Sequence, residues 1–110
     1  MPTFADLPVS EPYEGSTRRA IEGEKATVIR YTLDEGHAFP LHRHPEEQIT
    51  LVEAGELDFT LGTETRRVQA GDYVVVPPDV EHCARSLRGT ASLLCVVAPA
   101  RRDVGAVPVG

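Results

Sequence analysis

Short segments rich in β-branched and aromatic residues, separated by turn residues, are the feature of this sequence that most limits its fold. Residues 26–33 (ATVIRYTL) favour a strand by composition, and residues 57–61 (LDFTL) alternate apolar and polar side chains as a half-buried strand does. Turn signals recur at residues 23–25, 34–36, 62–64, 70–72, 77–79 and 87–89. Because no stretch shows a convincing helix, this regular spacing predicts an all-β fold, an antiparallel barrel or sandwich.

The same patterns place the individual strands. One further strand is expected to carry His42 and His44, and residues 53–56 are expected to join two strands. The remaining strands are predicted at residues 17–22, 26–33, 48–52, 57–61, 65–69, 73–76, 80–86 and 91–98.

A chain of 110 residues is long enough to bury one hydrophobic core, so we predict a single domain over residues 1–110. Its first residues carry three prolines and no periodicity, and its last residues include two glycines. We expect an extended arm at residues 1–16, a barrel at 17–99 and a flexible tail at 100–110.

Charge and composition exclude several partners. The formal net charge is −6 and the charged residues are interspersed, so no basic stripe is available for nucleic-acid phosphates. The first 15 residues lack the basic and apolar regions of a signal peptide, and the longest apolar run, residues 91–100, is too short to span a bilayer. We therefore expect a cytoplasmic protein with no nucleic-acid or membrane partner.

Cys83 and Cys95 have neither metal-ligand spacing nor the density of a disulfide scaffold, and no disulfide is predicted.

Residues 36–55 (GHAFPLHRHPEEQITLVEAG) carry the most informative polar residues. His42, His44 and Gln48 are separated by two and by four residues, and even spacings place side chains on one side of an extended strand. Imidazole is the commonest protein metal ligand, so this pattern indicates half of a metal site. The plainer interpretation is an exposed polar strand with a solvated rim.

A second stretch, residues 71–86 (GDYVVVPPDVEHCARS), adds His82. On its own this histidine is more often a hydrogen-bonding residue than a ligand. Together the two stretches resemble the cupin superfamily. In the first cupin motif, Gly36, His42, His44 and Gly55 match, with Gln48 at the usual glutamate position.

In the second cupin motif Gly71, Pro77 and His82 match, whereas Asp79 replaces a glycine and Ser86 an asparagine. The resemblance covers residues 36–86. It implies a jelly-roll barrel that holds a divalent metal ion through His42, His44, Gln48 and His82. Zinc, nickel, iron and manganese all accept three nitrogens and one oxygen, and the sequence does not choose among them.

Gln48 distinguishes this site from the usual cupin motif, which has a glutamate at that position. Glu46 and Glu47 are neighbouring alternatives, but Glu47 is out of phase with the histidines and Glu46 lies near the Pro45 bend, so Gln48 is favoured. Three neutral imidazoles and a neutral amide leave both positive charges of a divalent ion uncompensated. The ion should then be a stronger Lewis acid.

Three uses of such a site differ in class. A non-redox enzyme would polarise a carbonyl and stabilise an enolate, giving isomerisation, cyclisation or lyase chemistry. A dioxygenase would bind substrate and dioxygen together, and a binding module would capture a small ligand without chemistry. We favour cyclisation or isomerisation of a carbonyl-bearing small molecule.

Two subfamilies share the short single-domain form. Cupins that convert unsaturated uronates carry an aspartate and an aromatic residue where this chain has Cys95 and Val97, while Arg101 matches their arginine. The absence of the aspartate carboxylate and of the aromatic ring argues against the conversion of uronates. The other group is the cupin-type cyclases of aromatic polyketide pathways, and a mouth lined by Leu93, Cys95 and Val97 suits an apolar aromatic substrate better than a sugar acid. We predict that these three residues and Arg101 form the substrate pocket.

Several groups could act as the general base, and a metal-bound hydroxide is preferred because it needs no further residue. Candidates are Tyr31, Tyr73, Glu46 and a metal-bound hydroxide, but both tyrosines sit in apolar strands and packing in the barrel wall is the more frequent role. Tyr73 and Glu46 are kept as weak catalytic candidates.

Ile49 and Leu51 should point away from the metal ligands, and the N-terminal arm or a second subunit could cover them. We therefore predict a homodimer.

Overall fold

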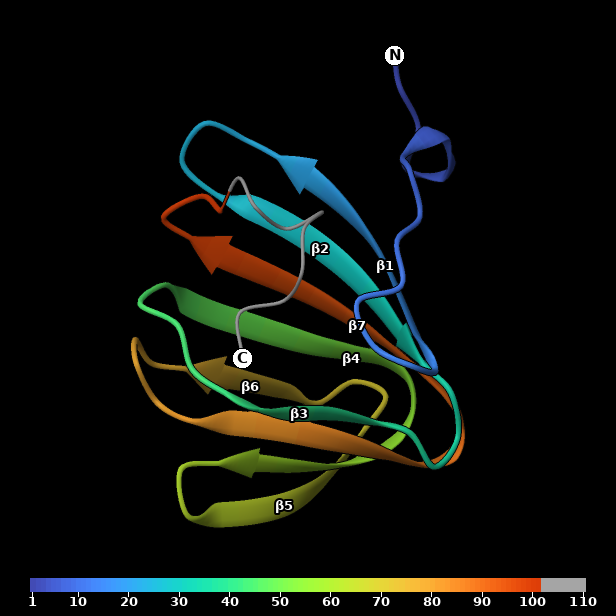
Figure 1. Cartoon of the computed structure of the whole chain (residues 1–110), viewed down its shortest axis with the longest axis vertical. Helices are drawn as coiled ribbons and strands as arrows, with labels where there is room; N and C mark the ends of the chain where they lie inside the picture. The colour runs from blue at the N-terminus through green and yellow to red at the C-terminus, as the bar shows by residue number, and fades with distance from the viewer. Residues whose placement is uncertain (102–110) are drawn as a thin grey trace.

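The structure, a computed structural model, describes residues 1–101 and is an antiparallel β-barrel (Figure 1). This confirms the predicted all-β fold. A single turn of 3-10 helix, η1 (Phe4–Asp6), lies in the N-terminal arm, which was expected to be extended throughout. The strands are β1 (Ser16–Glu22), β2 (Thr27–Leu33), β3 (Ala38–His42), β4 (Glu47–Leu61), β5 (Glu64–Gln69), β6 (Tyr73–Val76) and β7 (His82–Ala98).

Most of the predicted tail, from residue 102 onward, lies outside the described residues. Within residues 1–101, no helix has the length and hydrophobicity needed to cross a membrane.

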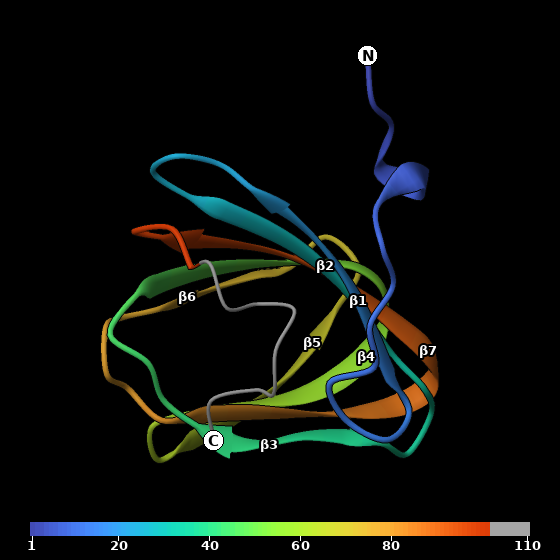
Figure 2. The ribbon, with the colours of Figure 1, turned by 45° about the horizontal axis from the view of Figure 1, so that its top comes forward.

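The barrel has two layers, and the long strands β4 and β7 pass from one layer to the other (Figure 2). In one layer the order is β1-β2-β7-β4-β6, and in the other β3 and β5 flank the remaining halves of β7 and β4. All pairings are antiparallel. The interior between the layers is where inward-facing side chains from both halves meet.

The continuity of β4 and β7 differs from the prediction. Residues 87–89 were expected to form a turn, but β7 runs through them, and β4 likewise runs through residues 53–56. The β4–β7 pairing shifts register between Val52 and Leu57, and Gly55 and Gly89 have positive φ angles of 84° and 64°. Bulges of this kind bend a strand without ending it, so glycines that suggested turns mark the corners of the barrel.

Alternate residues of the strands point into the barrel. Ile29, Cys95 and Thr50 are register partners across β2, β7 and β4, and all three are buried. The apolar core comprises Ile29, Leu33, Val52, Leu57, Phe59, Val68, Val76, Ala84, Ala91, Leu93, Cys95 and Val97. Polar side chains share this interior, among them Arg18, Thr50, His44 and His82. Since burying polar groups costs free energy unless they are paired, these residues mark a candidate functional site.

Gly55 lies at a close approach of β4 to β7. A Cβ atom at this position would lie 2.8 Å from the Ala91 Cα and 3.1 Å from the Thr90 carbonyl oxygen. We predict that Gly55→Ala lowers the free energy of unfolding by about 2 kcal/mol, because it combines backbone strain with a steric clash. Chemical denaturation measures this. Gly71→Ala is the matched control: its φ is 96° but nothing lies within 4 Å, so an equal loss would show that the close approach does not matter.

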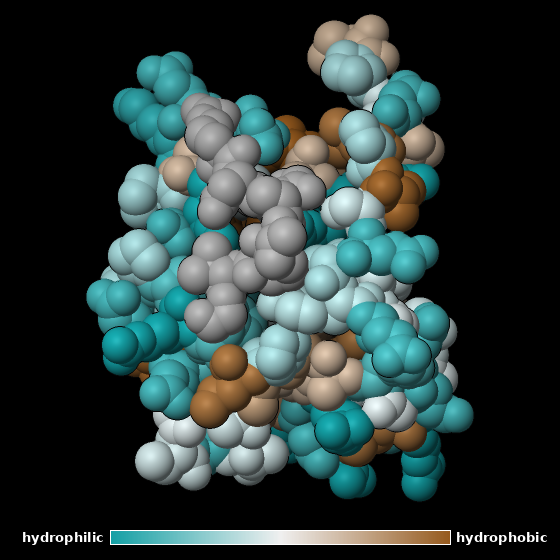
Figure 3. Space-filling model, in the orientation of Figure 1, coloured by the Kyte–Doolittle hydropathy of each residue, from teal (hydrophilic) through white to brown (hydrophobic). Residues whose placement is uncertain are grey.

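Hydrophobic side chains remain exposed on the outer face of β4 and β6. Ile49 is 39% exposed and Leu51 43%, and their partners across the strand pair are Val75 and Tyr73. In the N-terminal arm, Phe4 packs over the guanidinium of Arg30, 4.6 Å from the ring centroid, and Ile49 and Leu51 stay exposed. On the face shown in Figure 3, hydrophilic residues cover most of the surface.

We predict that this β4–β6 face joins two copies of the chain. Ile49→Glu should then convert a dimer to a monomer, because it places a charge in an apolar interface. Light scattering at micromolar concentration measures the mass. Leu41→Glu, at an exposed position on β3 in the other layer, should leave the dimer intact. A wild-type monomer would contradict the prediction.

Candidate metal centre

Three histidine side chains from separate segments meet inside the barrel. His42 ends β3, His44 lies in the connection to β4, and His82 begins β7. His42 and His82 are register partners in the β3–β7 pairing. One ligand atom of each histidine lies within 4.8 Å of the others, so the cluster is able to bind a metal ion.

The tautomer of each ring is fixed by a hydrogen bond to the backbone. In every case Nδ1 donates to a carbonyl oxygen two residues away, at 2.8 or 2.9 Å. The acceptors are Pro40 for His42, Glu46 for His44 and Val80 for His82. Each Nε2 therefore carries a lone pair that is available to a ligand, which is the usual arrangement around a bound metal.

Two further observations fit a bound cation. The Nε2 atom of His82 is buried and has no hydrogen-bond partner. The Nε2 atom of His44 lies 3.1 Å from Oε1 of Gln48, and the Gln48 amide nitrogen donates to Thr50 Oγ1 at 2.9 Å. With the His44 proton on Nδ1, two acceptor atoms face each other, an arrangement that a positive ion relieves. Three imidazole nitrogens and one amide oxygen suit zinc, nickel, iron or manganese.

Burial favours the neutral form of His42 and His82. Desolvation lowers the pKa of His42 and lowers that of His82 to about 4, and the neighbouring histidines lower both further. Neutral imidazole is the form that binds metal, so protons compete weakly with a metal ion at neutral pH.

The lowered pKa of His82 should make the stability of the metal-free protein depend on pH. In the unfolded chain His82 takes up a proton near pH 6.5, whereas in the folded chain it resists protonation until about pH 4. The unfolded state binds more protons in this window, so stability should fall as the pH falls from about 6.5 to about 4. Urea denaturation across this window measures the slope. His82→Leu should make the slope shallower, and an unchanged slope in this variant would contradict the assignment.

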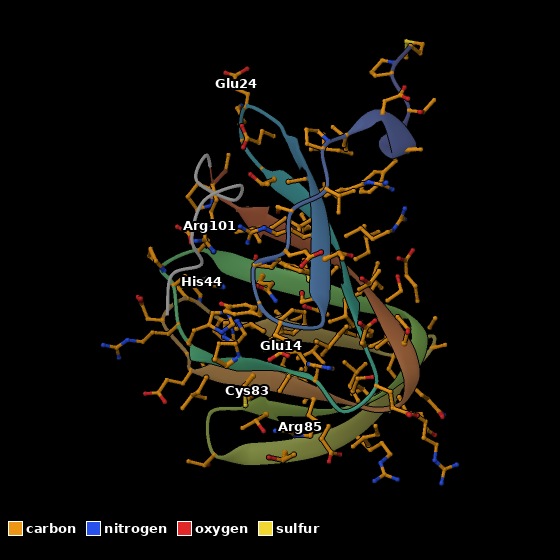
Figure 4. All side chains as sticks on the ribbon, turned by 45° about the vertical axis from the view of Figure 1, so that its right-hand side comes forward. Glu14, Glu24, His44, Cys83, Arg85 and Arg101 are labelled. Atoms are coloured by element: carbon orange, nitrogen blue, oxygen red, sulfur yellow. The ribbon has the colours of Figure 1, made fainter. Side chains whose placement is uncertain are left out.

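The two catalytic candidates lie away from the space enclosed by the Nε2 atoms. Oε1 of Glu46 lies on the Nδ1 side of His44, at 3.6 Å, and 3.5 Å from Nε of Arg101. Figure 4 shows Arg101 beside His44 at one end of the barrel. Tyr73 is 68% exposed on β6. The structure therefore supports neither residue as a base, because neither lines the cavity beside His42 and His82.

A cavity opens beside the histidines, and its wall contains most of the predicted pocket. Leu93, Cys95 and Arg101 line it, together with His42, Gln48 and His82. Val97 does not line this cavity; it is buried in register between Thr27 and Gln48. The adjoining Cys95 has its pKa raised to about 12 by burial, so the thiol stays protonated at neutral pH.

Several cavity residues were not anticipated. Tyr31 was expected to be wall packing, but it lines the cavity, as does Arg18 from β1. The signal for Tyr31 was present, since it is in phase with the inward residues Ile29 and Leu33. The other unanticipated lining residues are Tyr13, Phe39, Thr50, Phe59, Cys83 and Ala84.

An antiparallel barrel of two layers with a cluster of three histidines is typical of small cupins. A cupin domain model matches residues 29–97, and the chain belongs to this family.

Three relatives illustrate the family in sequence. H2HPP isomerase of Bacillus subtilis is 35% identical over 68 residues, 61% of this chain and 28% of that protein. Dimethylsulfoniopropionate lyase DddQ of Ruegeria pomeroyi is 38% identical over 55 residues, 49% of this chain and 27% of that protein. The chain thus spans little more than a quarter of either. The uncharacterized protein SCO3923 of Streptomyces coelicolor is 27% identical over 86 residues, 78% of this chain and 82% of that protein.

Solved structures share the fold. An RmlC-like cupin from Shewanella frigidimarina superposes with a TM-score of 0.85 at 23% identity, over 93% of this chain and 92% of that chain. KdgF from Halomonas sp. superposes with a TM-score of 0.85 at 23% identity, over 94% of this chain and 98% of that chain. Oxalate decarboxylase of Lactobacillus farciminis superposes with a TM-score of 0.80 at 20% identity, over 87% of this chain and 31% of that chain.

Proposed function

We propose that this cupin is a metal-dependent enzyme that moves a proton on a small carbonyl-bearing molecule, giving isomerisation, cyclisation or elimination. The observation that carries the proposal is the convergence of His42, His44 and His82, each with its Nδ1 proton committed to the backbone. A divalent ion held by these residues and Gln48 would polarise a carbonyl group and stabilise enolate charge.

The chain's own side chains supply the surroundings that such chemistry needs. Phe59 lies parallel to the His82 ring with centroids 6.4 Å apart and forms part of the apolar wall of the cavity. Leu93 and Cys95 add apolar wall to the same cavity. An apolar wall beside the histidines excludes water from that side of the cavity and strengthens electrostatic interactions with charge that develops on the substrate.

The names of two relatives support proton transfer over oxidation, since one is an isomerase and the other a lyase. Uronate conversion, suggested by the likeness to KdgF, is less well supported by the residues present. Cys95 occupies the position of the expected carboxylate, and its protonated thiol is a poor substitute for a base. Arg18 and Arg101 in the wall also make the cavity more polar than an aromatic polyketide alone requires.

The proposal is tested by deuterium exchange. Protein loaded separately with zinc, nickel, iron or manganese is incubated in D2O with a panel of small ketones and 2-oxo or 3-oxo acids, and NMR follows deuterium incorporation beside the carbonyl. Catalysed exchange with redox-inert zinc is expected, and oxygen uptake is not. Exchange that persists in His82→Ala, no exchange with any metal, or oxygen uptake in its place would overturn the proposal.

A further inference from the structure

Arg18 is a buried cation to which the proposed function gives no role. It lies on β1, is 6% exposed and lines the same cavity as His42 and His82. A guanidinium keeps its charge at any physiological pH and is rarely buried unless other groups pair with it.

The strand pairing holds Arg18 in a defined position. Arg18 is the register partner of Tyr31 on β2, and Tyr31 is the partner of Leu93 on β7, so the three side chains form one inward row across three strands. Arg18 hydrogen-bonds to the Tyr31 phenol, and its Nε donates to Ser10 Oγ at 3.3 Å. Groups fixed on strands in this way are suited to bind a ligand in a single orientation.

We propose that Arg18 and Tyr31 bind a carboxylate of the substrate, so that this enzyme acts on a small carboxylic acid. A guanidinium donates two parallel hydrogen bonds to a carboxylate, and a phenol donates a third. This inference rests on the proposed function and specifies its substrate class.

The charge of the cavity supports an anionic ligand. Among residues 1–101, the residues that line it include Arg18 and Arg101 but neither aspartate nor glutamate. Arg101 is partly balanced by Glu46, whose carboxylate lies 3.5 Å from its Nε outside the cavity wall. Burial raises the pKa of Tyr31 to about 12, so the phenol keeps its proton and can donate it in a hydrogen bond to an anion.

The rest of the wall indicates a flat substrate. Phe39 makes edge-to-face contacts with Tyr13 and Tyr31, at centroid distances of 6.0 and 5.2 Å, and all three rings line the cavity. Aromatic surfaces of this kind pack well against planar groups. The substrate class is therefore a small carboxylic acid whose body is unsaturated or aromatic and carries a carbonyl.

The test compares an acid with its neutral ester. Benzoylformate and methyl benzoylformate have the same flat ketone body, and isothermal titration calorimetry measures their dissociation constants for the zinc-loaded full chain. We expect the acid to bind at least about tenfold more tightly than the ester, since a charge-assisted pair of hydrogen bonds is lost in the ester. Arg18→Met should remove this preference and leave ester binding within about twofold of wild type.

Control variants separate the possible explanations. Arg30→Met removes an outward-facing arginine paired with Glu53 and should change neither dissociation constant. Tyr31→Phe keeps the ring and should weaken acid binding severalfold, which provides a test if Arg18→Met does not fold. Arg18→Lys keeps the charge without the planar fork and should fall between wild type and Arg18→Met.

Three outcomes would overturn the inference: equal binding of acid and ester by wild type, an acid preference that survives in both Arg18→Met and Tyr31→Phe, or no binding of either probe. An acid preference that survives in both variants would indicate that the carboxylate binds at the zinc ion instead. An acid preference that depends on Arg18, combined with no deuterium exchange in any metal-loaded form, would uphold the carboxylate site and refute the proposed enzyme.

Discussion

His82→Ala should lower the affinity of the protein for divalent metal ions at least about a hundredfold and abolish metal-dependent proton transfer. His82 supplies one of only three imidazoles in the cluster, and its Nε2 is buried without another partner. Loss of a residue that merely orients a metal ligand commonly costs 10- to 100-fold in affinity, and loss of the ligand itself should cost more.

Competition with a chromophoric chelator measures the affinity of wild type and variant for zinc. His37→Ala is the matched control, because His37 lies in the turn before β3 and is not part of the cluster. It should retain wild-type affinity. Equal affinity of wild type and His82→Ala would contradict the metal centre. Circular dichroism of the metal-free proteins tests whether the variant keeps the β-barrel, so that a folding defect is not mistaken for loss of a ligand.

The residues of the candidate metal site were predictable from their spacing, but their arrangement was not. The even spacing of His42, His44 and Gln48 implies one extended strand. In the structure β3 ends at His42, His44 lies in the connection and Gln48 lies on β4, so the fold of this connection brings the three side chains together. The place of His82 beside His42 comes from the antiparallel β3–β7 pairing.

The far wall of the cavity was harder to predict because it depends on how the barrel closes. Arg18 lies on an edge strand, and nothing local distinguishes an inward arginine there from an outward one such as Arg30. Its inward direction is set by pairing with Tyr31, a long-range contact. The corners at Gly55 and Gly89 were misread for a related reason, since a bulge and a turn use the same residue type.

Glu46 shows a third limit. Glu46 lies in the connection between β3 and β4, where strand phase does not apply, and its carboxylate lies on the Nδ1 side of the His44 ring and near Arg101. Strand phase gives the direction of a side chain and not which edge of a neighbouring ring it meets. Only the bend at residues 43–46, where β3 has ended and β4 has not begun, decides this.

Gln48→Glu should bind zinc about a hundredfold more tightly than wild type and catalyse deuterium exchange about tenfold more slowly. The Gln48 amide oxygen faces His44 Nε2 and carries no formal charge. Replacing it with a carboxylate adds an attraction of about 4 kcal/mol at 4 Å for unit charges and an effective dielectric constant of 20, of which about 3 kcal/mol should remain after desolvation. The same negative charge weakens the polarisation of a substrate carbonyl.

Chelator competition and NMR-detected exchange measure the two effects on the same zinc-loaded samples. Gln48→Ala is the comparison variant, because it removes the oxygen without adding charge and should weaken zinc binding. Thr50→Val tests the orientation of the amide, since Thr50 accepts a hydrogen bond from the Gln48 nitrogen at 2.9 Å. Affinity that rises in Gln48→Glu while exchange also accelerates would show that charge at the metal does not limit the reaction. Unchanged affinity in all three variants would place Gln48 outside the ligand set, with the three histidines binding the ion alone.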